Sequence, residues 1–561
     1  MIRDQPRVVF DHNLVHTKHS STQYLLSSMS CLAPLITFLQ SPERICQCAI
    51  GTKSQRQTYA FFSCYASQLV TCLTRNSPHT ASIHTLDDYS VLNVFYLYRP
   101  AILDGDEDNS VRLRGGRGWD REQWWYKLAH VCQRWRNLVL GSASHLGLCL
   151  VCTHGTPVAD MLAHSPPGPP LPLVLDYLDG DWEITTKEEG VILALGQRDR
   201  VRRVRLRMPV PNLQNLIMAI DEEYPLLEYL IMGPPIEDRS AALILPETFQ
   251  APHLRHLVLR GFALPMGSRL LMTAVNIVTF CLYMDHPSTY FQPNTLLHWI
   301  SFMPLLESLL IVFFFPIPNI DVEGQLSLTP ITTHVTLLNL RWFWFQGVSA
   351  YMEAVVQRIT TPRLEKLSIH FFKQLTFSVP RLLQFMNTTE NLRFDSATFK
   401  FYKDDIDVVV YPSEEGEMYA LSMTIYCWHL DWQVSSVAQI FNLLGQRLST
   451  VEHLTLKHEV HSRSSEEHNE VDRTVWRKLL RSFRNVKTFC VDDGLVKELS
   501  RCVRLEDGEL PLELLPELQE LTYSGSGNAR DALTSFINAR QVAGRPVNLV
   551  HSDPRSAILP S

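Results

Sequence analysis

The sequence lacks the run of about 20 uncharged, proline-free apolar residues that a membrane-spanning helix needs. The best candidate, residues 301–318, contains Glu307 and is interrupted by Pro304 and Pro316. The N-terminal apolar stretch, residues 24–39, starts late and is broken by Pro34, which is not typical of a signal peptide. An excess of positive charge is also lacking, since the net charge is −7. We therefore expect neither a membrane nor a nucleic acid as partner.

A disulfide framework is lacking too. The 12 cysteines are scattered without a regular pairing pattern, which predicts reduced thiols in a cytoplasmic or nuclear protein. Cys149 and Cys152, with His154 beyond them, resemble half of a zinc site. No second cysteine pair follows at zinc-site spacing, and residues i and i+3 of a strand point to opposite faces. We interpret them as structural thiols and expect no metal site.

Catalytic motifs are lacking as well. The sequence contains no Gly-x-x-x-x-Gly-Lys, Gly-x-Ser-x-Gly, His-Glu-x-x-His or Gly-x-Gly-x-x-Gly motif. Asp104, Asp106 and Asp108 alternate as in a calcium loop, but Asn109 and Gly115 stand where that loop needs glycine and glutamate. We expect no catalytic residues and no cofactor. An enzyme hidden in the irregular segment 392–423 stays a third possibility, which a deep pocket lined with titratable groups would favour.

What the sequence does contain is a repeat. From about residue 200, the template apolar-x-x-apolar-x-apolar recurs at intervals of about 29 residues. Blurred units lie near Leu392 and Met418. The clear matches are Val201/Val204/Leu206, Leu227/Leu230/Met232, Leu254/Leu257/Leu259, Ile277/Phe280/Leu282, Leu306/Leu309/Ile311, Val335/Leu338/Leu340, Leu364/Leu367/Ile369, Val451/Leu454/Leu456, Val486/Phe489/Val491 and Leu518/Leu521/Tyr523.

Each unit predicts one short parallel strand that returns through a helix or an irregular arm, such as the amphipathic segment 474–483. A single unit cannot cover its own apolar face, so neighbouring units must stack on it. Proline-containing turns precede several strands, at Pro252, Pro304 and Pro362. The units resemble leucine-rich repeats, without a consistent asparagine after the strand. The predicted fold class is α/β, with a solenoid built on a curved parallel sheet.

Two helices are predicted before the repeats. Residues 86–98 have Thr85 or Asp87 as a candidate cap and end before Pro100. Residues 121–140 carry an apolar stripe at spacings of three and four, and the strand-like segment 145–154 follows. The stripe consists of Trp124, Leu128, Val131, Trp135 and Leu138.

The segment 86–138 resembles an F-box. Its second half matches Leu-x-x-Val-Cys-x-x-Trp-Arg-x-Leu throughout, whereas in the first half Asp87 and Tyr89 replace the usual proline and acid. The resemblance, together with the repeats, is to fungal F-box proteins. It implies docking of this module on a Skp-type adaptor, which links it to a cullin–RING ligase. The implied adaptor contacts are Leu86, Leu92, Phe95, Val131, Cys132, Trp135 and Leu138.

The repeat array would then select the target protein through the residues that flank the apolar strand positions. Many of them are cationic or histidine, which favours an acidic or phosphorylated target segment, although simple solubilisation of an exposed face would explain them equally well. The predicted target-binding residues are Arg203, Arg205, Tyr229, His256, Arg260, Arg341, Lys366, His370, His453 and Lys457. The aromatic run 342–345, directly after a predicted strand, favours core packing, with a ligand-facing role as the alternative.

The sequence thus predicts five parts. An N-terminal extension covers residues 1–80. A helical module covers residues 81–146, with an inserted loop over 100–120. A connecting segment with a capping strand (147–200), the solenoid (201–550) and a short tail (551–561) follow. The expected function is the substrate-recognition subunit of a SKP–cullin–F-box ubiquitin ligase. The alternative is a repeat scaffold whose degenerate F-box has no ligase link.

Overall fold

The computed structural model describes residues 86–98, 124–154, 156–163, 170–178, 188–315, 334–372, 378–413, 418–459, 471–503, 513–524 and 528–552. The chain divides into two compact units, Met1–Tyr98 and Arg99–Ser561. The predicted extension 1–80, the inserted loop with its alternating acids, and most of the tail 551–561 lie outside the described residues.

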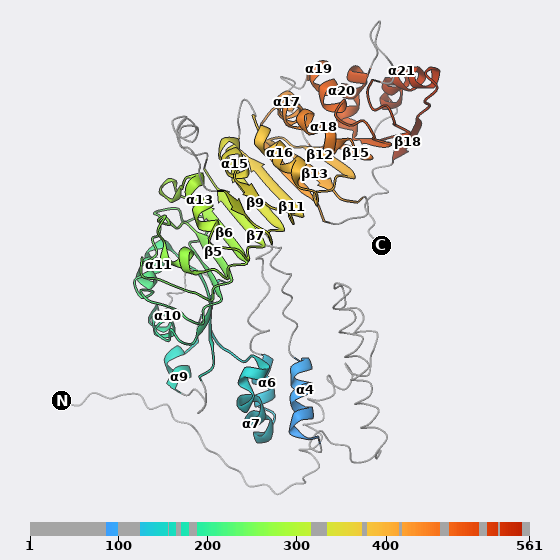
Figure 1. Ribbon diagram of the computed structural model, residues 1–561. Coiled ribbons are helices and arrows are strands. Elements are labelled where there is room, and N and C mark those ends of the chain that lie inside the picture. The colour runs from blue at the N-terminus through green and yellow to red at the C-terminus, as the bar shows by residue number, and fades with distance from the viewer. Residues whose placement is uncertain are drawn as a thin grey trace, which may run out of the picture. The chain divides into compact units, whose positions relative to one another are not determined.

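A single 16-stranded sheet forms the framework of the second unit, as far as its residues are described. Its order is β1-β2-β3-β4-β5-β6-β7-β9-β11-β14-β13-β12-β15-β16-β17-β18 (Figure 1). The strands are β1 Leu150–Cys152, β2 Leu173–Tyr177, β3 Val201–Arg207, β4 Tyr229–Gly233, β5 His256–Arg260, β6 Thr279–Met284, β7 Ser308–Phe313, β9 Trp342–Gly347, β11 Lys366–Phe371, β12 Ser396–Phe401, β13 Asp405–Tyr411, β14 Leu421–Tyr426, β15 His453–His458, β16 Thr488–Val491, β17 Glu520–Ser524 and β18 Asn548–Ser552.

The helices that connect the strands lie along one face of this sheet (Figure 1). They are α9 Val158–Ala163, α10 Glu188–Leu195, α11 Val210–Ile217, α12 Arg269–Thr273, α13 Pro293–Ile300, α15 Ser349–Val356, α16 Pro380–Thr388, α17 Leu430–Phe441, α18 Gly445–Leu448, α19 Arg473–Leu480, α20 Asp493–Val503 and α21 Asn528–Val542, with single 3-10 turns at Pro287–Thr289 and Asn442–Leu444. None of the helices in the described part of the chain is long and apolar enough to cross a membrane.

The core lies between the sheet and this helical layer. In β5 and β9, buried residues alternate with half-buried ones, so Leu257, Leu259, Phe343 and Phe345 face the helices and are almost completely buried. Each helix contributes its own apolar stripe, as with Trp476 in α19. These observations confirm the predicted α/β class and the mostly parallel, curved sheet.

Asparagine side chains link each of three proline-containing turns to the next unit by a hydrogen bond. The side-chain amides of Asn276, Asn339 and Asn391 donate hydrogen bonds of 3.0, 3.1 and 3.0 Å to the carbonyls of the three predicted turn prolines, Pro252, Pro304 and Pro362. In the sequence, no consistent asparagine follows the strand. The structure places it in the turn of the following unit instead.

One strand corrects the expectation of a wholly parallel sheet. The strand β13 pairs antiparallel with β12 on one side and with β14 on the other. β14 then pairs parallel with β11, and β12 pairs parallel with β15. The segment 396–426 is therefore a three-stranded meander inserted into the solenoid. This explains why the repeat template is blurred between Leu392 and Met418.

The predicted strand around Val335, Leu338 and Leu340 is wrong by five residues. The strand of this unit is β9. The template is matched by Leu340, two residues before the strand, and by Phe343 and Phe345 within it, and all three are buried. Residues 335–336 form only the short strand β8 (Val335–Thr336), which pairs with β10 (Ile359–Thr360) in a separate two-stranded sheet. The aromatic run 342–345 thus belongs to the strand itself and does not follow it.

The first predicted helix is confirmed as α4 (Asp88–Tyr98), and the Asp87 carboxylate caps it by accepting a hydrogen bond of 2.8 Å from the Ser90 amide.

The single predicted helix 121–140 is wrong. Two helices occur instead, α6 (Trp124–Ala129) and α7 (Gln133–Gly141). The Cys132 side chain caps the start of α7, because its sulfur accepts a hydrogen bond from the Trp135 backbone amide. The predicted strand 145–154 is confined to β1, after the short helix α8 (Ala143–Leu146).

Candidate functional site

The face of the sheet opposite the helices, here called the open face, carries most of the predicted target-binding residues. The strand register aligns Arg203, Tyr229, His256, Thr279, Ser308, Trp342 and Lys366 in one row across seven neighbouring strands. A second row contains Arg260, Tyr283, Val312, Gln346, His370, Thr424, Asp407, Lys400 and Lys457. Arg205 lies between the rows, His453 begins β15, and Arg341 precedes β9 by one residue.

A hydrophobic cluster, here called the apolar patch, occupies the middle of the open face. Its centre consists of Cys281, Leu310 and Val312, which are 6%, 1% and 3% exposed. Val258, Tyr283, Phe314, Trp342 and Trp344 pack around this centre and are only partly buried. Strand alternation therefore divides the aromatic run 342–345 between two environments. The phenylalanines lie in the helix-side core, and the tryptophans lie in the apolar patch.

Both tryptophans carry a polar group that the protein leaves unsatisfied. The indole Nε1 atoms of Trp342 and Trp344 are buried and have no hydrogen-bond partner. Their ring centroids lie 6.0 Å apart, and the imidazole of His370 stacks on Trp344 with a centroid distance of 5.4 Å. Burial lowers the pKa of His370, although the nearby Asp407 carboxylate acts in the opposite direction. A neutral imidazole therefore borders the patch at neutral pH.

Arginine side chains border the patch on the other side. The Arg260 guanidinium contacts Asp285 at 2.5 Å and lies 5.5 Å from the ring centroid of Tyr283 and 5.0 Å from that of Phe314. Burial raises the pKa of Asp285, against the effect of Arg260. These contacts hold Arg260 at the edge of the aromatic group. Its role here combines an ion pair with cation–π packing.

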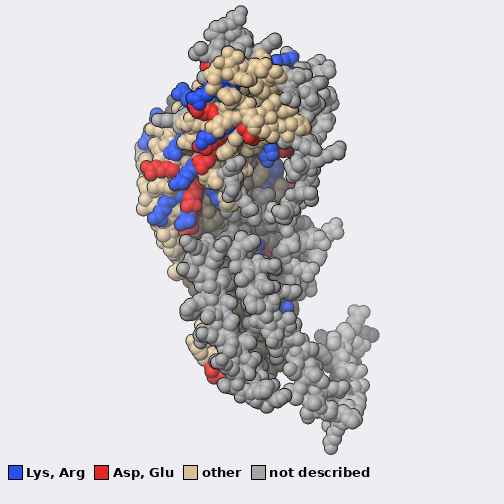
Figure 2. All heavy atoms as spheres, turned by 90° about the vertical axis from the view of Figure 1, so that its right-hand side faces the viewer, with Lys and Arg blue, Asp and Glu red and all other residues tan. Residues whose placement is uncertain are grey.

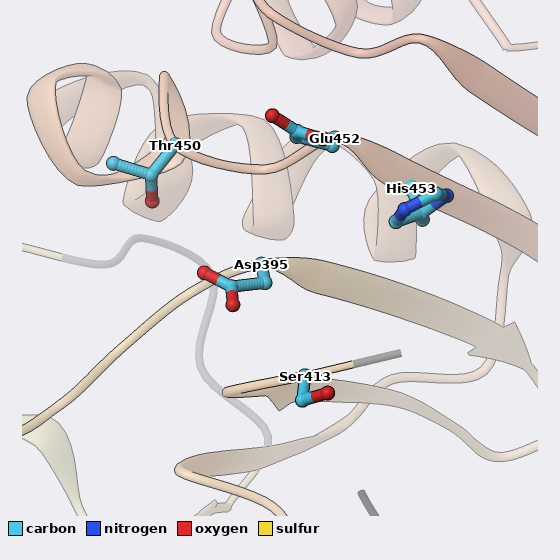
Figure 3. Close-up of a pocket in the computed structure, with 5 residues that line it drawn as sticks. All are labelled: Asp395, Ser413, Thr450, Glu452 and His453. Atoms are coloured by element: carbon cyan, nitrogen blue, oxygen red, sulfur yellow. The ribbon is translucent and has the colours of Figure 1, made fainter. Parts of the chain in front are cut away.

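A separate, polar pocket of about 300 Å³ lies where the meander meets β15. Figure 3 shows its five lining residues, with Asp395 and Ser413 from the meander on one side and Thr450, Glu452 and His453 on the other. Glu452 forms an ion pair of 2.7 Å with Lys487, which lowers the pKa of the carboxyl group. His453 Nδ1 lies 2.6 Å from Thr488 Oγ1. Glu452 and His453 of this pocket thus contact structural partners.

Charges of both signs are interleaved on the C-terminal repeats. Figure 2 shows Lys and Arg beside Asp and Glu on the upper part of the described surface. Glu513 accepts from both Arg477 and Arg481, and Arg545 pairs with Glu517. The pairs made by the exposed Arg481 and Arg545 contribute little to stability, about 0–1 kcal/mol each. In the described residues, no cluster of His, Cys, Asp or Glu could hold a metal ion.

The F-box-like residues differ in exposure. Phe95 and Trp135 are buried, whereas Val131 is 50% exposed in the turn between α6 and α7. The other predicted adaptor contacts, Leu86, Leu92, Cys132 and Leu138, are half-buried. The turn itself is held by Arg136, whose Nε donates to the Ala129 carbonyl at 3.0 Å.

The centre of the apolar patch is not predicted by the repeat template, because Cys281, Leu310 and Val312 lie outside the template positions. A signal was present nonetheless. In β6 and β7 apolar residues fill both the inward and the outward positions, as in LLIVF over residues 309–313. A strand that is apolar on both faces is covered on both faces.

No protein-family model matches the chain, and no curated protein matches it. Among solved structures, it aligns with the crystal structure of the TLR13–ssRNA13 complex at 14% identity with a TM-score of 0.29, over 72% of this chain and 50% of that one. It also aligns with the leucine-rich repeat-containing protein LegL7 from Legionella pneumophila at 11% identity with a TM-score of 0.22, over 63% of this chain and 84% of that one. The chain thus spans about half the length of the TLR13 chain that it matches.

The repeats of the chain itself define its class. Units of one strand and one helical arm share a continuous sheet, and the apolar template recurs at each strand. This is a leucine-rich-repeat-like solenoid, an architecture suited to binding other proteins along its sheet.

Proposed function

We propose that this protein is the substrate-recognition subunit of a SKP–cullin–F-box type ubiquitin ligase in the cytoplasm or nucleus. The helices α4, α6 and α7 dock on the Skp-type adaptor. The open face of the solenoid binds the target protein, and the chain itself has no catalytic role. The observation that carries the binding half is the open face, over which none of the helices in the described part of the chain forms a second layer (Figure 1).

The adaptor half of the proposal is supported by the match to the second half of the F-box pattern and by exposed apolar groups on these helices. Val131 is half-exposed, and Tyr89, Tyr96 and Leu97 of α4 are exposed as well. On α4 itself, the exposed Tyr89, Tyr96 and Leu97 leave apolar surface that a partner could cover. Trp135, being buried, would support the docking helices from within and would not contact the adaptor directly.

The test is co-purification of the tagged full-length chain with a Skp-type adaptor. Val131→Asp places a charge on the exposed turn and should abolish capture without unfolding the chain. Val542→Asp is the matched control, because Val542 is 90% exposed at the end of α21 and carries the same substitution. Capture by the wild type and the control, with loss in Val131→Asp, supports the ligase role.

A repeat scaffold without a ligase link is the alternative. Asp87 stands where the F-box pattern has proline, and no family model matches the chain. If the folded wild type captures no adaptor, the ligase role is wrong and the scaffold function takes its place. The open face would bind partner proteins in either case.

A further inference from the structure

We propose that the protein pairs with a second copy of itself along the edge of the sheet at which the strands begin, with β6 on the two-fold axis of the pair. This edge, here called the turn edge, consists of the turns before β3, β4, β5, β6, β7, β9 and β11 and of the row of residues described next. The proposal goes beyond the proposed function and does not rest on it. The order of the charges along the edge and the exposed aliphatic side chains beside them lead to it.

Backbone hydrogen bonds place one residue of each unit in a row along the turn edge. The Glu228 carbonyl accepts from the amides of Arg255 and His256, and the Glu307 carbonyl accepts from those of Arg341 and Trp342. The same kind of contact joins each row residue to the next one from β3 to β11. In the order of the strands, the row, here called the charge row, contains Arg202, Glu228, Arg255, Val278, Glu307, Arg341 and Glu365.

The charge row is complementary to itself when it is reversed. Its signs run positive, negative, positive, neutral, negative, positive, negative, so the reversed row carries the opposite charge at every charged position. A two-fold axis through Val278 therefore brings Arg255 of one copy to Glu307 of the other. It likewise brings Arg341 to Glu228 and Glu365 to Arg202. Because neighbouring strands are evenly spaced, by about 4.7–4.9 Å, all of these positions meet in the same register. A two-fold axis is the commonest symmetry of protein dimers.

The charges nearest the axis have no partner in their own chain. Arg255, Glu307, Arg341 and Glu365 are exposed, and none of them forms an ion pair with another of the residues that the structure describes. Arg202 and Glu228, at the far end of the row, pair with each other at 2.9 Å. Since the row contains three cations and three anions, it selects neither an acidic nor a basic partner. It fits a surface with the same alternation in reverse, which a second copy supplies.

The outer turns are complementary as well. The segments 196–200 and 218–226, before β3 and β4, contain two arginines and four acids and thus carry a net charge of −2. The segments 334–339 and 357–363, before β9 and β11, contain two arginines and no acid and thus carry +2. The same two-fold axis places the first pair of segments opposite the second pair. The turns next to the axis, residues 251–253, 274–276 and 303–305, contain no charged residue apart from a histidine.

Aliphatic side chains in the turns supply the attraction. Leu226, Val275, Leu305 and Leu338 are 46%, 47%, 45% and 59% exposed. Val275 belongs to the unit of β6 and meets its own counterpart at the axis. The axis also places Leu226, before β4, opposite Leu338, before β9. Burial of these groups favours association, whereas exposed ion pairs contribute little energy and mainly fix the register.

The open face is not used in this contact. The charge row and the turns come before the first residues of the strands, whereas the two rows of the open face lie within the strands. Reversal about an axis through β6 also keeps the direction in which the sheet curves, so the two curved edges can follow each other. A pair of chains would therefore present two open faces.

The experiment is sedimentation velocity of the full-length chain over a micromolar concentration series. We expect a species of twice the mass of the 64.4 kDa chain. Arg255→Glu creates two contacts between like charges, because each copy contributes one, and Glu307→Arg does the same. Each of these variants should weaken association at least tenfold. The double variant should dimerise again. An equal mixture of the two single variants should also dimerise, because each reversed charge then meets its opposite.

Matched variants keep the test specific. Lys478→Glu reverses an exposed charge on α19, in the helical layer, and should dimerise as the wild type does. Leu338→Asp should weaken association, whereas Val542→Asp, at a residue that is 90% exposed at the end of α21, should not. Thermal unfolding of each variant checks that the chain is folded. A wild type that stays monomeric, a dimer that persists in both single variants, or a mixture of these variants that stays monomeric would each overturn the proposal.

The outcome is separable from that of the proposed function. Adaptor capture is tested at Val131, which lies outside the turn edge, and is measured on the same preparation. A monomeric chain that captures the adaptor overturns only the pairing of two copies. A dimer that captures no adaptor overturns only the ligase role.

Discussion

The imidazole of His370 stacks on the indole of Trp344, with the ring centroids 5.4 Å apart and the ring planes inclined by 25°. The two residues occupy neighbouring strands, β11 and β9. His370 also lies in one row with Thr424 and Asp407 of the meander. Burial lowers the pKa of His370 below its ordinary value of 6.5, so the folded chain takes up a proton less readily at this site than the unfolded chain does.

Acid should therefore destabilise the repeats around β11. Because the unfolded state binds the proton more tightly, the contribution of His370 to stability is present above pH 6.5 and decreases as the pH falls below it. His370→Gln should reduce the difference in urea midpoint between pH 7.5 and pH 5. His130→Gln, at an exposed position before α7, should leave that difference unchanged. An identical pH dependence in His370→Gln and wild type would contradict the prediction.

Asp405 should respond to pH in the opposite sense. Burial, together with repulsion from Asp407 and Asp404, raises its pKa from 3.8 to about 6. The folded chain thus holds the proton more tightly, and the stabilisation by protonation is lost as the pH rises from 3.8 to about 6. Asp405→Asn should stabilise the chain at pH 7, by less than about 2 kcal/mol since the group is partly exposed, and have little effect near pH 4. Thermal unfolding measures this, and exposed Asp199→Asn should show no such trend.

The asparagines of the proline turns should contribute to stability individually. Asn339→Ala removes the bond to the Pro304 carbonyl and also the acceptor for Arg363, which lies 3.3 Å from its Oδ1. A loss of about 1 kcal/mol is expected for one exposed amide–carbonyl bond. Denaturant unfolding with Gln357→Ala as control tests it, because Gln357 is exposed at the end of α15. Equal loss in both variants would mean that the turn bond contributes nothing.

Arg540 should be needed for the C-terminal repeats. Its guanidinium is completely buried and donates to the carbonyls of Leu514, Leu515, Pro516 and Leu518 at 3.0–3.3 Å. Arg540→Met leaves these carbonyls unpaired, which should cost about 3–5 kcal/mol. Hydrogen exchange of the β17 and β18 amides should accelerate strongly. Arg545→Met removes only an exposed pair with Glu517, and exchange should stay close to that of the wild type.

Much of the fold follows from the sequence because burial on the helix side is periodic. Wherever the template positions are the only apolar ones, as at Val201, Val204 and Leu206, the predicted strand is the observed one. The prediction was wrong where a competing apolar pattern was present. Around Val335 two matches to the template lie five residues apart, and in the first of them Leu338 is exposed, so only the second marks the strand. A template alone cannot separate two such registers, since both satisfy the same spacing.

The candidate site was less accessible to sequence reasoning. The prediction put the cationic residues on the open face through strand alternation, and it did not find that apolar side chains lie between them. Whether Trp344 faces the helices or the open face depends on the strand register, because a shift by one residue exchanges the two faces. Likewise, the break at Cys132 depends on a thiol acting as a helix cap, which is an uncommon choice and is hidden inside a strong helical stripe.

The inserted meander also bears on how the chain folds. In a regular solenoid each new strand pairs with the one made just before it, so structure propagates between sequence neighbours. Here β11, which pairs with β9 on one side, finds its second neighbour only in β14, some fifty residues later, and β12, which pairs with β13, finds its second neighbour in β15. Closing this longer loop costs entropy before any pairing compensates for it. We therefore expect the two halves of the solenoid to fold as separate regions that join through the meander.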